Sequence, residues 1–307
     1  MVIRKPGYYD RFQCIAGACK DNCCIGWEID IDEKTAEKYK NEYGGLGDRL
    51  RGNIEWGESP HFILGEGERC PFLNCDNLCD IICERGEDML CSVCADHPRF
   101  RCELPGRIET GLGLCCEAAG ALILGKKEPV TLEITGDAET ADEIVELRDK
   151  ILNILQNREK SIDARVAEVL SLCGSIVPEM TWAEIADFFL SLERLDEAWT
   201  NQLNYLKNCE ADMESFAEYM KDRDTEYEQF LVYLIYRHFA NAPDLWQMSA
   251  RCAFAVFSYS LIKWLGALHY AMNGEFTFED QVELCRLFSS EIEYSKENLY
   301  EVIELMY

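Results

Sequence analysis

Residues 14–24 have the sequence CIAGACKDNCC, and residues 70–83 have the sequence CPFLNCDNLCDIIC. Residues 91–94 add a third closely spaced pair, CSVC. The thiolate is a good metal ligand, and short spacings let several sulfurs reach one ion at little cost in loop closure. The sequence therefore predicts one or more cysteine-ligated metal sites in the N-terminal part of the chain.

The chain has 17 cysteines, and they are distributed very unevenly. All but four lie at or before Cys116, and the others stand alone in helical sequence, as Cys173, Cys209, Cys252 and Cys285. Lone cysteines of this kind are usually small apolar core residues. A reducing compartment disfavours disulfides, so the clustered cysteines indicate metal binding. A metal-free cysteine-rich domain and a disulfide scaffold are the alternatives.

The identity of the metal is left open by the residues. Four thiolates suit a closed structural zinc site, and they suit a [4Fe–4S] cluster equally well. His97 is the histidine nearest to the cysteine groups, but a histidine in a His-Pro-Arg turn is more often structural. All-sulfur ligation does not distinguish zinc from an iron–sulfur cluster, so a chemical measurement is needed to identify the metal.

The spacing of apolar residues divides the chain into two parts. Residues 1–125 are rich in glycine, proline and cysteine and show no long helical period, so they are expected to need metal–thiolate bonds as cross-links. Residues 126–307 are predicted to form a helical domain. The predicted fold class is mainly α: a loop-rich, metal-bound N-terminal region with short strands, followed by an α-helical C-terminal domain.

Individual elements can be placed within this division. Thr181-Trp-Ala-Glu184 is a capping box that begins a helix running toward Asn208. The apolar stretch 252–272 is interrupted by Lys263 and His269, so it is predicted to be a buried core helix rather than a membrane span. Other helices are predicted over 32–43, 117–124, 138–156, 225–241, 244–273, 277–290 and 295–306, and strands over 107–114 and 129–135.

The charge of the chain restricts its partners. It carries 57 acidic and 30 basic side chains, for a formal net charge of −27. Such a chain is repelled by nucleic acid and by anionic membranes, whereas a lysine-rich protein partner would be attracted. Acidity that serves only solubility is the simpler alternative. The N-terminus has no apolar signal segment, so we expect a soluble, cytoplasmic protein.

The cysteine-rich sequence resembles the flagellin lysine-N-methylases, which belong to a wider group of zinc- or iron-chelating domain proteins. The resemblance begins with Phe12-Gln-Cys14 and with CKDNCCIGW at residues 19–27. It continues through CPFLN at 70–74, LCDI at 78–81, LCSVC at 90–94, HPR at 97–99 and LCCEAA at 114–119. It covers residues 8–124, in an order and spacing specific for the domain.

Residue by residue, the resemblance implies a set of metal ligands. The family-like cysteines are Cys14, Cys19, Cys23, Cys24, Cys70, Cys79, Cys91, Cys94 and Cys115. The chain departs from the family pattern at His97, where an aromatic residue is usual, and at four additional thiols, Cys75, Cys83, Cys102 and Cys116. The additional thiols leave open a second or larger cluster.

The resemblance implies transfer of methyl groups from S-adenosylmethionine to the lysines of a flagellin-like protein, with an iron–sulfur cluster or zinc as cofactor. The chain has no G-x-G-x-x-G signature and no alternation of strands and helices, so the common methyltransferase fold is not expected. The iron–sulfur site itself is then one place where the donor could bind. A metal-stabilised protein-binding module and a metal carrier without methyltransferase activity are the alternative functions. No catalytic residue is assigned.

Overall fold

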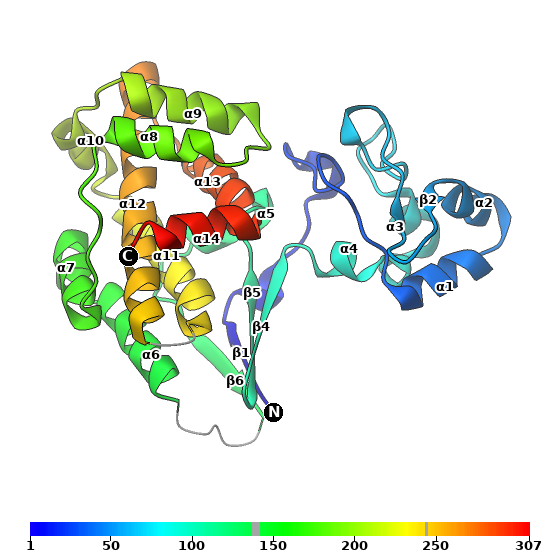
Figure 1. Ribbon diagram of the computed structural model, residues 1–307, viewed down its shortest axis with the longest axis horizontal. Coiled ribbons are helices and arrows are strands. Elements are labelled where there is room, and N and C mark those ends of the chain that lie inside the picture. The colour runs from blue at the N-terminus through cyan, green and yellow to red at the C-terminus, as the bar shows by residue number, and fades with distance from the viewer. Residues whose placement is uncertain (137–141, 243–244) are drawn as a thin grey trace. The chain divides into compact units, whose positions relative to one another are not determined.

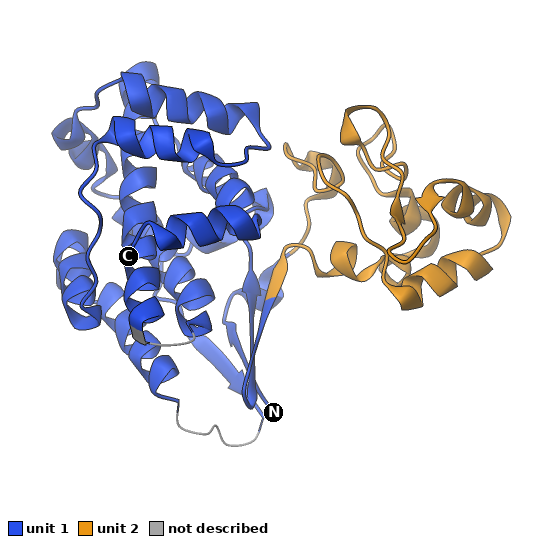
Figure 2. Ribbon diagram, in the orientation of Figure 1, with its two compact units in different colours: residues 1–12, 101–307 blue, residues 13–100 orange. Residues whose placement is uncertain are grey.

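In the computed structural model the chain forms two compact units (Figures 1 and 2). The structure describes residues 1–136, 142–242 and 245–307. One unit, here called the cysteine-rich unit, consists of residues Gln13–Phe100, and the other, here called the helical unit, consists of Met1–Phe12 and Arg101–Tyr307. The chain therefore starts in the helical unit, leaves it after residue 12 and returns to it at residue 101.

The cysteine-rich unit combines short helices, a two-stranded ribbon and loops. Asp32 caps the first helix by accepting a hydrogen bond from the Thr35 backbone N–H at 3.0 Å. Three rings, those of Tyr39, Phe62 and Phe72, pack together in the core. The elements are α1 (Glu33–Asn41), α2 (Gly44–Gly52), β2 (Ile54–Glu55), β3 (His61–Phe62), α3 (Asp80–Arg85) and α4 (Ser92–Asp96).

The helical unit contains a four-stranded sheet with the strand order β4-β5-β1-β6. The N-terminal strand β1 pairs in parallel with β5 and antiparallel with β6, so it lies inside the sheet. Gly106 allows the tight turn between β4 and β5 because its φ of +77° is one that glycine adopts without strain. The strands are β1 (Val2–Pro6), β4 (Arg99–Leu104), β5 (Arg107–Leu112) and β6 (Leu132–Thr135).

The helices of this unit pack around α12 (Leu245–Asn273), which contacts α7, α9, α10, α11, α13 and α14 (Figure 1). Trp246–Asn273 is long and apolar enough to cross a membrane, but 78% of its most apolar window is buried inside the protein. This confirms the core helix predicted from residues 252–272. The other helices are α5 (Glu117–Leu124), α6 (Glu143–Leu155), α7 (Ile162–Cys173), α8 (Trp182–Ser191), α9 (Glu197–Asn208), α10 (Met213–Met220), α11 (Asp224–His238), α13 (Phe278–Phe288) and α14 (Lys296–Glu304).

The mainly α fold class is confirmed, and so is the capping box at Thr181. Two expectations differ from the structure. The single helix expected from residue 181 toward residue 208 is two helices, α8 and α9, because Asp196 caps a new helix by accepting from the Ala198 N–H at 2.8 Å. The compact units meet at residues 100 and 101 rather than at 125, because β4 and β5 belong to the same sheet as β1. Part of the predicted helix 138–156 and the first residue of 244–273 lie outside the described residues.

Candidate metal centre

Five of the nine cysteines predicted as ligands gather in the core of the cysteine-rich unit. Cys70 and Cys91 are buried there, at 6% and 1% exposure. Cys24, Cys79 and Cys94 are partly buried and pack against the same core. We call these five residues the thiol cluster; they come from three sequence segments that lie up to 70 positions apart.

Backbone contacts hold the three segments together. The Cys70 N–H donates to the Cys24 carbonyl at 2.8 Å, which joins the first segment to the second. An isolated bridge between Leu73 and Cys79 folds the second segment back on itself. Cys79 stands at the N-cap of α3 and Cys91 at the N-cap of α4, so each thiol is placed where a short helix begins.

Backbone N–H groups are directed at several of these sulfurs. Burial raises the pKa of Cys70 to about 11, and the N–H groups of Phe72 and Leu73 act against this rise. Burial likewise raises the pKa of Cys79, and the N–H groups of the first turn of α3 lower it. Hydrogen bonds to sulfur favour the thiolate, which is the form that binds metals.

The five thiols also affect one another electrostatically. The hydrogen bond between Cys91 and Cys94 lowers the pKa of Cys91 and raises that of Cys94 far above its usual value. Charge on Cys70 raises the pKa of Cys24 and of Cys94. Mutual repulsion of this kind favours neutral thiols when no cation is present, and sulfur donors are the ligands that soft metals prefer.

The arrangement of the side chains is looser than that of a formed metal site. Among residues 1–136, 142–242 and 245–307, no three His, Cys, Asp or Glu side chains are placed to hold a metal ion. All 17 cysteines are free thiols. The cysteine-rich unit thus gathers thiol donors in its core, with neither a disulfide scaffold nor a defined coordination geometry.

The other predicted ligands lie elsewhere. Cys14 and Cys23 are exposed and Cys19 is half-buried, on the loop that leads into the unit. Cys23 hydrogen-bonds to Cys24, which lowers the pKa of Cys23. Cys115 is buried in the helical unit, where burial raises its pKa to about 12 and a hydrogen bond from Tyr294 opposes the rise. Of the additional thiols, Cys83 lies near enough to Cys79 to influence its pKa.

The helical unit has a buried polar centre of its own around Glu293. The Tyr233 hydroxyl donates to Glu293 Oε2 at 2.9 Å, and His238 Nε2 lies 2.6 Å from Glu293 Oε1. Arg237 Nε lies 3.5 Å from the same carboxylate. Burial raises the pKa of Glu293, but the charge of Arg237 and the His238 hydrogen bond outweigh burial and bring it to about 2. Glu293 ends a π-helical turn, Ser289–Glu293, a rare conformation that is frequent at functional sites.

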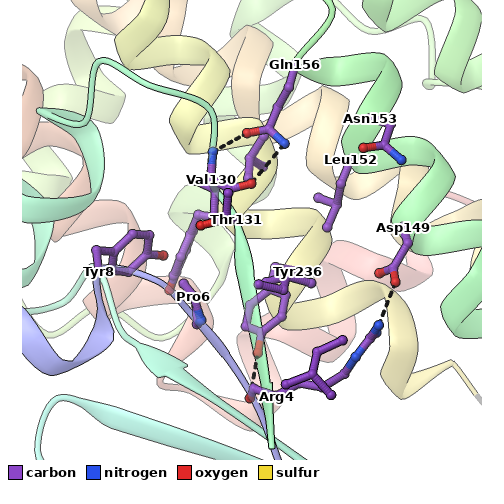
Figure 3. A pocket seen from close by; sticks show the side chains of 14 residues that line it. Arg4, Pro6, Tyr8, Val130, Thr131, Asp149, Leu152, Asn153, Gln156 and Tyr236 are labelled. Carbon is purple, nitrogen blue, oxygen red and sulfur yellow. Dashed lines mark hydrogen bonds and ion pairs between the residues drawn. The ribbon is translucent and has the colours of Figure 1, made fainter. Parts of the chain in front are cut away.

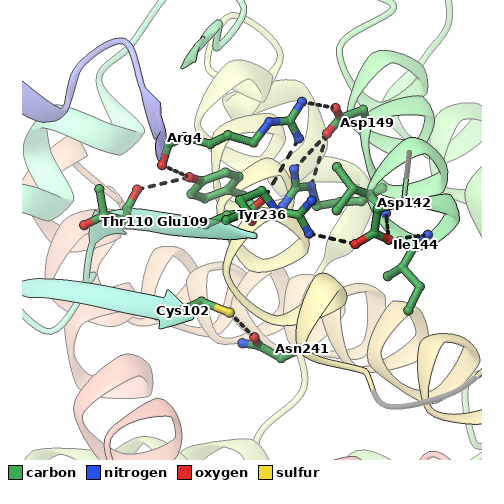
Figure 4. A network of polar contacts seen from close by, with 12 residues as sticks. Arg4, Cys102, Glu109, Thr110, Asp142, Ile144, Asp149, Tyr236 and Asn241 are labelled. Atoms are coloured by element: carbon green, nitrogen blue, oxygen red, sulfur yellow. Dashed lines mark hydrogen bonds and ion pairs between the residues drawn. The ribbon is translucent and has the colours of Figure 1, made fainter. Parts of the chain in front are cut away.

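A second network ties the sheet to α6 and α11 (Figure 4). Arg4 Nη2 lies 2.8 Å from Asp149 Oδ2, and Arg107 Nη2 lies 3.0 Å from Asp142 Oδ2. Glu109 on β5 is 2% exposed and pairs with Arg107 and Arg148. The network consists of three arginines and three carboxylates, so buried charge is compensated within it, as its burial requires.

Comparison with known proteins gives a consistent result. Residues 181–307 match the family model described as FliB lysine N-methylase C-terminal domain. The Lysine-N-methylase of Salmonella typhimurium is 28% identical over 142 residues, which is 43% of this chain and 35% of that protein. The Flagellar biosynthetic protein FliU of Salmonella muenchen is also 28% identical over 142 residues, and the match covers 43% of this chain and 82% of that protein. Over part of its length the chain is therefore similar to lysine-N-methylases.

The family resemblance predicted from the cysteine pattern is thereby confirmed, although the aligned segment spans only about a third (35%) of the Salmonella typhimurium lysine-N-methylase. No solved structure matches the chain. The lysine-N-methylase model matches the helical part of the chain, and the matched residues include Tyr233, Arg237, His238 and Glu293. This polar centre was not predicted from the sequence. The signal that it left in the sequence is a charged pair, Arg237-His238, directly after the apolar run 230–236.

Proposed function

We propose that the protein is a protein-lysine N-methyltransferase. The observation that carries the proposal is the match of residues 181–307 to the FliB lysine N-methylase C-terminal domain in a chain that also contains a cysteine-rich unit with the family-like cysteine pattern. The relatives named Lysine-N-methylase support this activity, and the name Flagellar biosynthetic protein FliU supports a flagellin-type substrate.

The proposed donor is S-adenosylmethionine. In the transfer, the lone pair of a neutral lysine amine forms a bond to the methyl carbon while the carbon–sulfur bond breaks. The electron pair of that bond stays on sulfur, so S-adenosylhomocysteine leaves, and the N-methylated amine is left protonated. A free lysine has a pKa of about 10.4, so its ammonium form must first lose a proton to a base or to water. The net charge of −27 favours the approach of a lysine-bearing surface.

We further propose that four of the five residues of the thiol cluster, Cys24, Cys70, Cys79, Cys91 and Cys94, hold a metal centre. The support is their shared core and the backbone N–H groups directed at Cys70 and Cys79. A [4Fe–4S] cluster is the proposed centre, and zinc is the alternative. When bound, the centre would cross-link three segments of a unit with few regular elements.

The test joins a metal measurement to an activity measurement. The full chain is purified without oxygen, and iron, zinc and acid-labile sulfide are determined for each chain. The same protein is then incubated with a flagellin-type protein and isotopically labelled S-adenosylmethionine, and methylated lysines are mapped by mass spectrometry. About four irons with matching sulfide and labelled N-methyl-lysine are the expected result.

Other outcomes separate the parts of the proposal. Methyl transfer by a protein that holds zinc and no sulfide would replace the iron–sulfur cluster by a structural zinc site. A metal-loaded protein that binds flagellin without methylating it would contradict the enzyme and favour a metal-stabilised binding module. Loss of the metal to an acceptor protein during the assay would favour the carrier.

A further inference from the structure

The helical unit contains a cavity of about 350 Å³ that the proposed metal centre does not use (Figure 3). Residues of β1, the segment 130–134, α6 and α11 line it, and all of them belong to the helical unit. Its volume lies within the range of small-molecule pockets, which is roughly 300–1,000 Å³. A single lysine side chain is slim and would leave most of this space unfilled.

The walls of the cavity are held in place before any ligand arrives. On one side Arg4 and Asp149 form an ion pair of 2.8 Å. On the rim the Gln156 side chain hydrogen-bonds to both the backbone N–H and the carbonyl of Val130. On the floor the single O–H of Tyr236 is shared between two backbone carbonyls, those of Thr110 at 3.0 Å and Arg4 at 3.1 Å. A prearranged wall of this kind lowers the ordering cost of binding.

The lining favours a ligand that has a flat or apolar body and a charged end that carries both signs. Asp149 is engaged by Arg4 at 2.8 Å and by Arg148 at 2.9 Å, so its carboxylate is already paired twice. A simple ammonium or a phosphate would have to displace one of these partners. The rings of Tyr8, Tyr233 and Tyr236 line the same space and offer surfaces for a planar group.

Tyr8 provides the observation that points to a bound molecule. Its side chain is only 3% exposed, and its hydroxyl points into the cavity (Figure 3). Tyr8 lines the cavity, and its pKa is raised by burial with no hydrogen bond acting on it. Buried polar groups in proteins are nearly always hydrogen-bonded, to protein, to water or to a ligand. The Tyr8 hydroxyl is thus a polar group available to a molecule inside the cavity.

We propose that this cavity, rather than the thiol cluster, binds the methyl donor S-adenosylmethionine, an inference that rests on the proposed methyltransferase function. The donor has a flat adenine ring for the tyrosine surfaces and hydroxyl and amino groups for Tyr8. Its amino-acid end is zwitterionic, so it can lie alongside the Arg4–Asp149 ion pair with opposite charges adjacent and without breaking that pair. The rim residue Asn153 lies exposed on α6 at the entrance.

The inference is tested by binding rather than by turnover. Calorimetry on the full, metal-loaded chain measures the affinity for S-adenosylmethionine and for its stable product S-adenosylhomocysteine. Asn153→Trp is expected to close the entrance and weaken binding at least tenfold, and Tyr8→Phe is expected to weaken it several-fold. The matched control is Glu146→Trp, at an exposed position on the same helix that does not line the cavity, and it should change the affinity less than twofold. Cys79→Ser should retain binding even where its metal content falls.

The outcomes separate this inference from the proposed function. Unchanged binding in both Asn153→Trp and Tyr8→Phe would overturn the cavity as the donor site. Loss of binding in Cys79→Ser but not in Asn153→Trp would overturn it as well. In either case methyl transfer by the wild type would still support the proposed function. A metal-loaded wild type that binds neither compound would contradict the inference and the use of this donor together. Wild-type binding and transfer, lost together in Asn153→Trp and kept in Glu146→Trp, would support both.

Discussion

The two units of this chain bury different kinds of interior. The helical unit closes around α11 and α12 with a conventional core of large apolar side chains, among them Phe230, Phe254 and Phe288, each fully buried. The cysteine-rich unit has few such residues, and thiols share its core with Tyr39, Phe62 and Phe72. A unit of this size buries a smaller fraction of its surface than a larger one does, so its core contributes less to stability. The comparison predicts that the two units respond to different perturbations.

Removing one thiol from each unit should affect the two interiors very differently. Cys70→Ser removes the buried thiol of the second segment, so it should lower the metal content per chain and loosen residues 13–100, because a structural metal contributes roughly 10 kcal/mol to folds of this kind. Hydrogen-exchange mass spectrometry should show faster exchange in the cysteine-rich unit and unchanged exchange in α11 and α12. Cys209→Ser is the control, because Cys209 is exposed at the end of α9. Equal exchange in both variants would show that the cysteine-rich unit needs no metal for its fold.

Truncating an apolar side chain in the core of the helical unit should destabilise that unit and leave the cysteine-rich unit unchanged. Phe254 is fully buried, stacks on Phe288 at 6.4 Å between ring centroids, and meets the His238 ring edge-on at 5.4 Å. Phe254→Ala should lower the free energy of unfolding of the helical unit by about 3–5 kcal/mol. Denaturant unfolding followed together with metal release tests this. If metal release shifted as much as the helical transition, the two units would unfold as one, and the comparison would fail.

The Glu293 centre should make the stability of the helical unit depend on pH. The pKa of this carboxyl is lowered from 4.5 to about 2 in the folded protein, so ionised Glu293 stabilises the fold at pH values above 4.5. That contribution is lost as the pH falls from 4.5 toward 2. Glu293→Gln should cost about 3 kcal/mol at neutral pH, because Arg237 and His238 lose a buried partner.

The measurement for Glu293 is a series of unfolding experiments between pH 7 and pH 3. The difference between wild type and Glu293→Gln should be constant down to about pH 4.5 and should then narrow. Glu301→Gln, on the exposed face of α14, is the control and should give a small difference at every pH. A Glu293→Gln difference that widened toward low pH would contradict the assigned ionisation.

The sequence predicted local features of this fold better than long-range ones. The helix that follows Asp32, the Thr181 cap, the core helix near residue 260 and the strand beginning at residue 107 depend on neighbouring residues, and the structure has them. The break between α8 and α9 contains neither glycine nor proline; Arg194 bonds to the Leu192 carbonyl there at 2.9 Å. Strand β1 was not predicted, because its partners lie about 100 residues or more further along the chain.

The same distinction applies to the candidate sites. Short cysteine spacings predicted that thiols converge, and five of nine do share a core. Spacing alone does not say which sulfurs face inward, and Cys115, which belongs to the helical unit, was grouped with the others by resemblance. The Glu293 centre joins α11 to a turn 55 residues later, and the cavity draws on four separate segments. Such sites arise from tertiary packing, so no local sequence pattern predicts them.

Removing one helix cap from each unit tests whether the caps contribute only to helix stability or also to metal retention. In the helical unit Thr181 Oγ1 accepts from the Glu184 N–H at 3.3 Å, and Glu184 Oε2 accepts from the Thr181 N–H at 2.8 Å. Thr181→Ala should cost about 1 kcal/mol in denaturant unfolding, and Thr181→Ser should restore most of it. In the cysteine-rich unit the Asp32 cap also accepts from the Ser92 N–H at 2.8 Å, beside Cys91, so it fixes a ligand segment as well as a helix. Asp32→Ala should therefore reduce metal retention while Thr181→Ala leaves it unchanged. If both variants kept their metal equally well, the Asp32 contact would be only a helix cap.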